Sequence, residues 1–312
     1  MAATRRARVR ALAKINLDLR VIGKRQDGYH EIRTVFQTIS LSDRLDLAFT
    51  AQRSTELTLS GNVDIPDNLA TRAAKLCLDE MRLTGRVEMR LEKKIPMGAG
   101  LGGGSSNAAA VLLALPVLAG GKIAAERLIA IGRELGSDVP FFLLGGRAAG
   151  IGRGTELYPL PDLPSRSALV VTPSLHVSTP DAYRSLGRGR LTTEVLQNNI
   201  DSFLGYVWEA GLGGGVNDFE EAVFRQHPQL KALKRKLIKI GASPAMLSGS
   251  GSSLFGVFGA RTQVARAVEA FQKETVFPVS LVSRSRYQSL WRRWLQPHGI
   301  QSKWPLQSRY AR

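Results

Sequence analysis

The sequence predicts an α+β fold divided into two domains. Strand-like alternation is concentrated in the first third of the chain, helical patterns follow a glycine-rich segment near residue 100, and strands and helices do not repeat as strict βαβ units. The length of 312 residues suits two domains, and a 44% hydrophobic share is typical of a globular core. We expect domains over 1–160 and 161–283, a proline-rich connection at 159–164, and a basic C-terminal extension over 284–312.

The first domain is expected to be rich in strands. Apolar and polar residues alternate along five segments, which predicts strands at 8–22, 34–41, 44–49, 56–59 and 87–93. A polar loop is expected over 23–30. A helix is expected over 68–83, because Gly85 supplies a stop just after it. Two further helices are predicted at 106–118 and 124–135.

The second domain is expected to mix helices and strands. Strands are predicted at 168–172, 246–248 and 254–258, and helices at 229–240 and 265–273. The chain has no internal repeat. Its last residues place Trp291, Trp294 and Trp304 among arginines without a clear period, so we expect 284–312 to be peripheral.

The formal net charge of +17 makes a nucleic-acid-binding protein a candidate class. The distribution of the charge argues against specific binding. Residues 284–312 hold seven Lys or Arg and no acid, and residues 1–10 hold four Arg and no acid. These two ends therefore supply eleven of the seventeen charges. A globular body with basic ends can bind polyanions non-specifically without that being its function.

Composition also bounds the compartment and the metal chemistry. The longest apolar run, 108–121, is too short to span a bilayer and contains Pro116, so no membrane association is expected. The single cysteine, Cys77, excludes an internal disulfide and fits a reducing, cytoplasmic location. The four His and one Cys show no metal-ligand spacing, so we expect no protein-built metal site.

The segment Pro96-M-G-A-G-L-G-G-G-S-S-N-A-A-A carries the main functional signal. It has five glycines within the seven residues 98–104, and it leads from a predicted strand into an alanine-rich helix. Glycine permits positive φ and a close approach of ligand to main chain. A helix N-terminus offers unpaired N–H groups and the positive end of the helix dipole. The segment therefore predicts an anion site, with phosphate as the usual anion.

Other nucleotide sites fit this segment less well. It contains no G-x-x-x-x-G-K-[ST], which excludes a Walker P-loop, and the chain has no H-R-D or D-F-G of protein kinases. Residues 98–103 satisfy G-x-G-x-x-G, but a dinucleotide site also needs an acidic strand end about 20 residues later, where the pattern from Ile123 is helical. A connection without a ligand stays possible, although such a turn needs one glycine rather than five.

Two charged residues are candidates for chemistry, and each has a structural alternative. Asp138, in G-S-D-V-P-F-F, is either a general base or the N-cap of a helix with Pro140 near its start. Lys14 lies within a predicted strand and points either to solvent or into a site, where it would offset phosphoryl charge. Asn16 shares the strand face of Lys14 because side chains alternate along a strand.

Two further segments also have both a functional and a structural interpretation. Tyr29 and His30 could stack on or hydrogen-bond a base, or could fill a turn. Residues 248–253, with the sequence S-G-S-G-S-S, lie between two predicted strands, and they form either a hairpin turn or a wall of the phosphate site.

Together these segments resemble the GHMP family of small-molecule kinases. Five segments occur in the family's order: Ala13-K-I-N-L-D-L, Arg25-Q-D-G-Y-H-E-I, the glycine segment from Pro96, Gly136-S-D-V-P-F-F and Leu247-S-G-S-G-S-S-L-F. Asn217-D-F-E also resembles a family motif, and the resemblance runs from about Lys14 to about Ser283. The D-G-Y-H loop narrows the resemblance to those family members whose substrate is cytidine diphosphate methylerythritol.

The resemblance implies a fold, a reaction and roles for individual residues. The implied fold is a two-domain GHMP kinase fold, with an N-terminal ATP-binding domain, a C-terminal ferredoxin-like α/β sandwich and the site between them. The implied reaction uses ATP and Mg²⁺ to phosphorylate the substrate's 2-hydroxyl. Asp138 would be the general base, Lys14 would stabilise the transferring phosphoryl group, and Asn16 would hold the methylerythritol end. Tyr29 and His30 would contact cytosine, and Tyr183 would stack on its other face.

By the same resemblance, the glycine segment would wrap the ATP phosphates, with Ser105 or Ser106 as a candidate magnesium contact. The implied nucleotide-binding residues are Pro96, Met97, Gly98, Ala99, Gly100, Leu101, Gly102, Gly103, Gly104, Ser105 and Ser106. Ser137 and Ser252 depart from the family's usual alanine and proline. Two alternatives stay open, another GHMP kinase acting on homoserine, mevalonate or a sugar, and a basic nucleic-acid-binding protein. A monomer and a homodimer are both expected possibilities.

Overall fold

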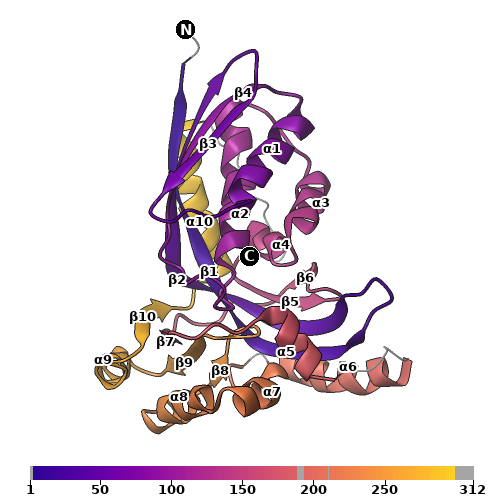
Figure 1. Cartoon of the computed structure of the whole chain (residues 1–312), viewed down its shortest axis with the longest axis vertical. Helices are drawn as coiled ribbons and strands as arrows, with labels where there is room; N and C mark the ends of the chain where they lie inside the picture. Colours follow the sequence, from indigo (N-terminus) through magenta and orange to yellow (C-terminus); the bar gives the residue numbers. More distant parts are fainter. Residues whose placement is uncertain (1–2, 188–192, 210, 299–312) are drawn as a thin grey trace.

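Two β-sheets, each with helices packed on it, organise the chain, as predicted for an α+β fold (Figure 1). The computed structural model describes residues 3–187, 193–209 and 211–298. The first sheet has the strand order β3-β4-β2-β5-β6, with β1 paired to β2. Its strands are β1 (Arg5–Lys24), β2 (His30–Ala51), β3 (Glu56–Gly61), β4 (Gly85–Glu92), β5 (Arg147–Ile151) and β6 (Glu156–Pro159).

β2 is one strand of 22 residues, where the sequence analysis expected separate strands at 34–41 and 44–49. The two residues between them, Ser42 and Asp43, are polar, but both are buried and hydrogen-bonded to partners outside the strand. Ser42 accepts a bond from Arg10 Nε at 2.8 Å, and Asp43 accepts bonds from the chain that leaves β4. The irregularity is instead a register shift against β1 between Leu12 and Lys14.

Helices cover one face of the first sheet (Figure 1). They are α1 (Leu69–Met81), α2 (Gly103–Ala119), α3 (Ala125–Leu135) and α4 (Val139–Leu144). α2 is buried almost all round, which explains its run of alanines and leucines. It begins at Gly103, three residues earlier than predicted, so the glycine segment itself forms the first turn. The short strands β5 and β6 were not expected.

The second sheet has the order β10-β7-β9-β8, and every strand pair in it is antiparallel. Counted from β7, this is the 4-1-3-2 arrangement of a ferredoxin-like domain. Its strands are β7 (Ser167–Thr172), β8 (Ala245–Leu247), β9 (Leu254–Phe258) and β10 (Thr275–Ser280), and its helices are α5 (Thr179–Ser185), α6 (Thr193–Trp208), α7 (Phe219–Gln226), α8 (Pro228–Lys239) and α9 (Arg261–Ala270). β10 contains Pro278 and escaped prediction, but an edge strand tolerates proline.

The interpretation of residues 284–312 as peripheral needs correction for the part that the structure describes. α10 (Arg284–Leu295) returns to the first domain and packs beside its strands, followed by a 3₁₀ turn, η1 (Gln296–His298) (Figure 1). Tyr287, Trp291 and Leu295 are buried in the first core. Their spacing of four residues places them on one face of the helix. Residues 299–312, including Trp304, lie outside the described residues.

α10 also supports the segment that follows Asp138. The Tyr287 hydroxyl donates to the Phe142 carbonyl in α4 at 2.5 Å. The Tyr287 ring occupies the space beside Gly145, where an added Cβ would lie 2.2 Å from a ring carbon. Within the described ranges, no helix is long and apolar enough to cross a bilayer.

We predict that Trp291→Ala lowers the free energy of unfolding by about 3–5 kcal/mol, the usual cost of emptying a buried aromatic site. Arg293→Ala, an exposed change on the same helix, should alter it by less than about 0.5 kcal/mol. Urea unfolding of both variants measures the difference. Equal, small effects would mean that α10 contributes nothing to the first core.

Candidate active site

The glycine segment links β4 to α2 and lines a cavity of about 380 Å³. The lining residues are Pro96, Met97, Gly98, Ala99, Gly100, Leu101, Gly102, Gly103, Gly104 and Ser105 from the segment, with Ile65, Asp67, Asn68, Leu69, Lys93 and Asn107 around it. The N–H groups of the first turn of α2 have no partner within the helix, because the first helical bond runs from Ser106 N to Gly102 O at 2.9 Å. The cavity therefore suits an anion.

Two glycines in this loop are required by close contacts. A Cβ on Gly100 would lie 1.9 Å from the Ser248 carbonyl oxygen, and Gly100 has φ +77°. A Cβ on Gly102 would lie 2.8 Å from the Phe142 ring and 3.1 Å from Lys14 Cγ. These contacts bring the loop against both the second domain and the side chain of Lys14.

The second glycine motif, 248–253, is a hairpin turn that packs on the glycine loop. It joins β8 to β9 and packs on the glycine loop, where Ser248 Oγ donates to Gly100 O at 2.9 Å and Ser253 N donates to Ala99 O at 3.3 Å. Asn217 Nδ2 donates to the carbonyls of Leu247 and Gly249, at 2.9 Å each. The motif is thus a hairpin turn that packs one domain on the other, and its role as a wall of the phosphate site stays a prediction.

Lys14 is buried, with 4% of its surface exposed, and it points into the site rather than to solvent. Its ammonium donates to Asn16 Oδ1 at 2.8 Å and lies 3.5 Å from Asp138 Oδ2. Asn16 Oδ1 also accepts from Gly249 N at 2.9 Å, and Asn16 Nδ2 donates to Thr34 Oγ1 at 2.8 Å. Asn16 therefore orients the lysine and ties β1 to the second domain.

Asp138 occupies the N-cap position of α4, but its side chain makes no capping hydrogen bond. Its carboxylate instead faces the Lys14 ammonium, and about a third of the side chain is exposed. The geometry leaves that carboxylate accessible to a bound molecule, with a cation beside it. A lysine and an accessible carboxylate therefore lie together beside the glycine loop, an arrangement that suits phosphoryl transfer.

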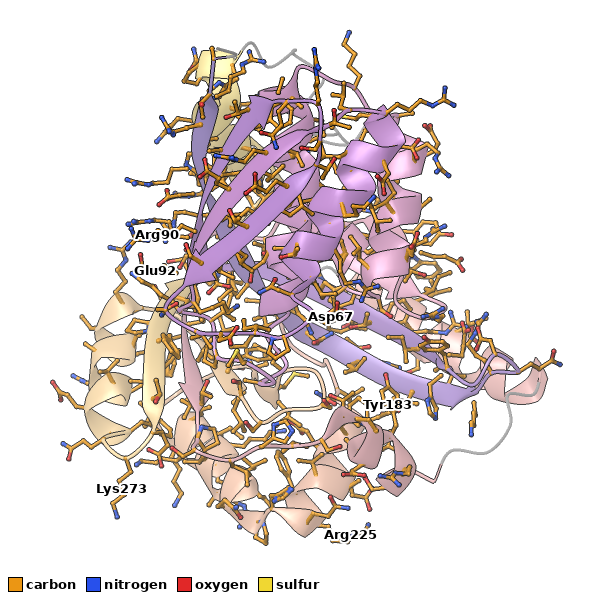
Figure 2. All side chains as sticks on the ribbon, turned by 45° about the horizontal axis from the view of Figure 1, so that its top comes forward. Asp67, Arg90, Glu92, Tyr183, Arg225 and Lys273 are labelled. Atoms are coloured by element: carbon orange, nitrogen blue, oxygen red, sulfur yellow. The ribbon has the colours of Figure 1, made fainter. Side chains whose placement is uncertain are left out.

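The ring of His30 stacks on Tyr183, with centroids 4.4 Å apart and planes 17° apart. This spacing leaves no room for a base between the two rings. Figure 2 shows Tyr183 on α5, where the second domain faces the extended β1–β2 pair. Burial first, and then the negative charge of Asp138, raise the pKa of Tyr183 to about 12. Burial first, and then the positive Lys24, lower the pKa of His30 from its ordinary value, which favours the neutral imidazole.

Tyr29 lies in the turn between β1 and β2, and 51% of its surface is exposed. The Arg153 guanidinium carbon sits 3.3 Å from the centre of its ring. Among the described contacts, the Tyr29 ring touches neither His30 nor Tyr183. The structure thus brings Lys14, Asn16 and Asp138 into direct contact and pairs His30 with Tyr183, while Tyr29 lies apart from both groups.

The sequence analysis missed several residues around the cavity. Asn68 was assigned to a helix, and it does cap α1, accepting from Ala70 N at 2.9 Å. Lys93 was taken as the last residue of a strand, but it lines the cavity beside Gly103. Its place directly before the glycine loop was the available signal. Ser106, predicted to contact phosphate or magnesium, is buried and donates to Leu12 O at 2.7 Å, whereas Ser105 faces the cavity.

Metal ligands are not clustered in the described part of the chain, where no group of three or more His, Cys, Asp or Glu could hold an ion.

Sequence families match both domains. The family described as GHMP kinases N terminal domain matches residues 68–146, and GHMP kinases C terminal matches residues 208–275.

Full-length relatives extend this match. The chain is 59% identical over 314 residues, or 99% of each chain, to a 4-diphosphocytidyl-2-C-methyl-D-erythritol kinase from Solibacter usitatus. It is 39% identical over 257 residues to the enzyme of that name from Bacillus cereus (strain AH187), covering 80% of this chain and 87% of the relative.

Solved structures share the fold. A crystal structure of 4-(cytidine 5'-diphospho)-2C-methyl-D-erythritol kinase matches with a TM-score of 0.73 at 38% identity, over 88% of this chain and 98% of that one. Homoserine kinase from Cytophaga hutchinsonii matches with a TM-score of 0.69 at 18% identity, over 89% and 95%, and at that identity it supports the fold alone. The chain belongs to the 4-diphosphocytidyl-2-C-methyl-D-erythritol kinase family of GHMP kinases.

Proposed function

We propose that this chain transfers the γ-phosphoryl group of ATP to the 2-hydroxyl of 4-diphosphocytidyl-2-C-methyl-D-erythritol, a step of isoprenoid biosynthesis. The observation that carries the proposal is the contact of Lys14 with both Asn16 and Asp138 beside the glycine loop. The relatives named for this reaction support the choice of acceptor. A cytoplasmic location and a monomeric or homodimeric state stay predictions.

In the proposed mechanism, the Asp138 carboxylate accepts the proton of the acceptor hydroxyl as the hydroxyl oxygen attacks the γ-phosphorus. The bond from that phosphorus to the β-bridging oxygen breaks, and ADP leaves. The Lys14 ammonium, held by Asn16, stabilises the negative charge on the transferring group. The main-chain N–H groups of the loop hold the phosphates in place, because this reaction depends chiefly on positioning and electrostatics.

The site also fits a magnesium ion carried by the nucleotide. Mg²⁺ prefers oxygen ligands and is usually bound through phosphates, waters and one or two protein groups. We propose Ser105 as the protein group near it. Ser105 lines the cavity, and its Oγ lies 3.7 Å from the point that a Cβ on Gly136 would occupy. Ser106 is a poorer ligand because its hydroxyl is already bonded to Leu12 O. When bound, the ion would neutralise phosphate charge.

For the acceptor, we propose that the cytosine contacts Tyr29, His30 and Tyr183. Because His30 covers one face of Tyr183, cytosine can stack on that face only after the imidazole moves. The neutral imidazole is suited to hydrogen-bond a base, since it offers one donor and one acceptor. Burial and the negative charge of Asp138 raise the pKa of Tyr183 to about 12, so its hydroxyl can donate a hydrogen bond.

The acceptor is tested by coupled ADP release with ATP and three substrates in parallel. We expect turnover with the cytidine diphosphate substrate and none above background with homoserine or mevalonate, because neither carries a base for the aromatic residues. Faster turnover with homoserine or mevalonate would assign the chain to another GHMP kinase activity.

We predict that Asp138→Asn lowers kcat by about 10²–10⁴-fold, the usual contribution of general base catalysis. Asparagine keeps the shape of the side chain but cannot take the proton, so ATP binding should persist. Steady-state kinetics with both substrates, and nucleotide binding by calorimetry, measure the two effects. Ser137→Ala, at the neighbouring position, is the matched control and should retain activity. A near-normal kcat in Asp138→Asn would remove this residue as the base.

We predict that KM for the cytidine substrate rises as the pH falls through the lowered pKa of His30. The pKa of His30 is lowered by burial and by Lys24, so the neutral ring is favoured in the folded protein. Protonation of His30 as the pH falls through that lowered pKa removes the neutral ring that is proposed to contact cytosine. KM measured against pH at saturating ATP should lose this rise in His30→Asn. An identical profile in that variant would mean that another group titrates.

A further inference from the structure

A buried carboxylate outside the reacting centre joins both ends of the glycine loop. Asp43 lies in β2 with none of its surface exposed, at the point where the pairing of β2 with β4 begins. Oδ1 accepts the main-chain N–H groups of Lys94 and Ile95, at 2.7 and 2.9 Å. These residues follow the end of β4 and precede the loop. One carboxylate oxygen therefore fixes the chain as it enters the loop.

The other oxygen of Asp43 fixes the chain where it leaves the loop. Oδ2 accepts Asn107 Nδ2, near the start of α2, at 2.9 Å, and it is hydrogen-bonded to the Lys93 ammonium. Lys93 Nζ also donates to Asn107 Oδ1 at 3.2 Å, which closes the network. Every loop residue that lines the anion cavity, from Pro96 to Ser105, lies between these two anchored points.

We propose that Asp43 is a positioning residue for the nucleotide, acting through the glycine loop that it anchors at both ends. The inference rests on the proposed use of ATP. Five glycines make this loop conformationally permissive, so its N–H groups would not stay aimed at phosphates without a support. Fixing the loop beforehand improves affinity, because less conformational entropy is lost when the ligand binds.

A simple counter-ion for Lys93 would not account for this geometry. Oδ1 of Asp43 accepts two main-chain N–H groups, and Oδ2 accepts one bond from Asn107 and one from Lys93. The lysine therefore supplies only one of the four bonds. A buried ion pair is also weak evidence for stability, because desolvation offsets much of its attraction. The network thus accounts for the shape of the loop better than for the stability of the fold.

The test compares Asp43→Asn with the wild-type chain. The side-chain oxygen of asparagine can still accept the N–H groups of Lys94 and Ile95. Its amino group, however, would face the Lys93 ammonium and the Asn107 amide as a donor facing donors. We expect Kd for a non-hydrolysable ATP analogue, AMP-PNP with Mg²⁺, to rise ~10-fold or more, as for loss of a charged hydrogen bond. KM for ATP should rise with it, whereas KM for the cytidine substrate should not change. Calorimetry and steady-state kinetics give these values.

Asp18→Asn is the matched control. Asp18 is equally buried, and it accepts a main-chain N–H from Val216 at 3.0 Å and the Arg20 guanidinium at 2.9 Å, but it holds no part of the loop. The Asp18→Asn variant should lower the melting temperature, as Asp43→Asn should, without changing Kd for AMP-PNP. Equal loss of nucleotide affinity in both variants would show a purely structural role and would overturn the proposal.

Asn107→Ala provides a second, milder variant, because it releases only the far end of the loop and leaves Asp43 with Lys93. It should also weaken AMP-PNP binding, and the double variant should bind no more weakly than Asp43→Asn alone, since both act through one network. If Asp43→Asn does not fold, wild-type affinity in Asn107→Ala overturns the proposal. If the wild-type chain binds AMP-PNP but does not phosphorylate the cytidine substrate, the proposed acceptor is wrong, whereas the role of Asp43 is not affected.

Discussion

The two domains meet where the main chain of the glycine loop passes the main chain of the 248–253 turn, and the site depends on this approach. No side chain fits between Gly100 and the Ser248 carbonyl. The approach lets Gly249 N reach Asn16, which in turn holds the Lys14 ammonium beside Asp138. This contact between domains therefore fixes the loop against the 248–253 turn and orients the lysine through Asn16.

Three buried charges organise the surroundings of this contact, and each is satisfied by several partners. Lys14 lies between Asn16 and Asp138, Asp18 accepts bonds from Arg20 and the second domain, and Asp43 holds the ends of the loop. Burial raises the pKa of Asp18, which is the cost of taking a carboxylate out of water. Such networks are costly when incomplete, so they favour one arrangement of the strands and loops over its alternatives.

Local chemistry explains which parts of the fold were predictable. Alternation predicted β1 and β4, and the glycine segment predicted an anion site at the start of α2, because these signals lie within neighbouring residues. β10 was not predicted because it contains a proline. β2 was predicted as two strands because polar residues lie in its middle, and their hydrogen-bond partners are distant in the sequence. The role of α10 was also missed. Its arginines suggested an exposed extension, but Tyr287 and Trp291 pack into a core that strands from the other end of the chain build.

The sequence by itself determined the class of fold, the position of the glycine-rich loop before α2 and the family resemblance, since each depends on contiguous motifs whose chemistry is local. Tertiary structure decided what those motifs face. It turned Lys14 inward, directed the carboxylate of Asp138 to Lys14 rather than to the backbone of α4, and set His30 on Tyr183. It also revealed Asp43, which carries no motif of its own. These outcomes depend on contacts between distant residues, and such contacts exist only once the two sheets have packed.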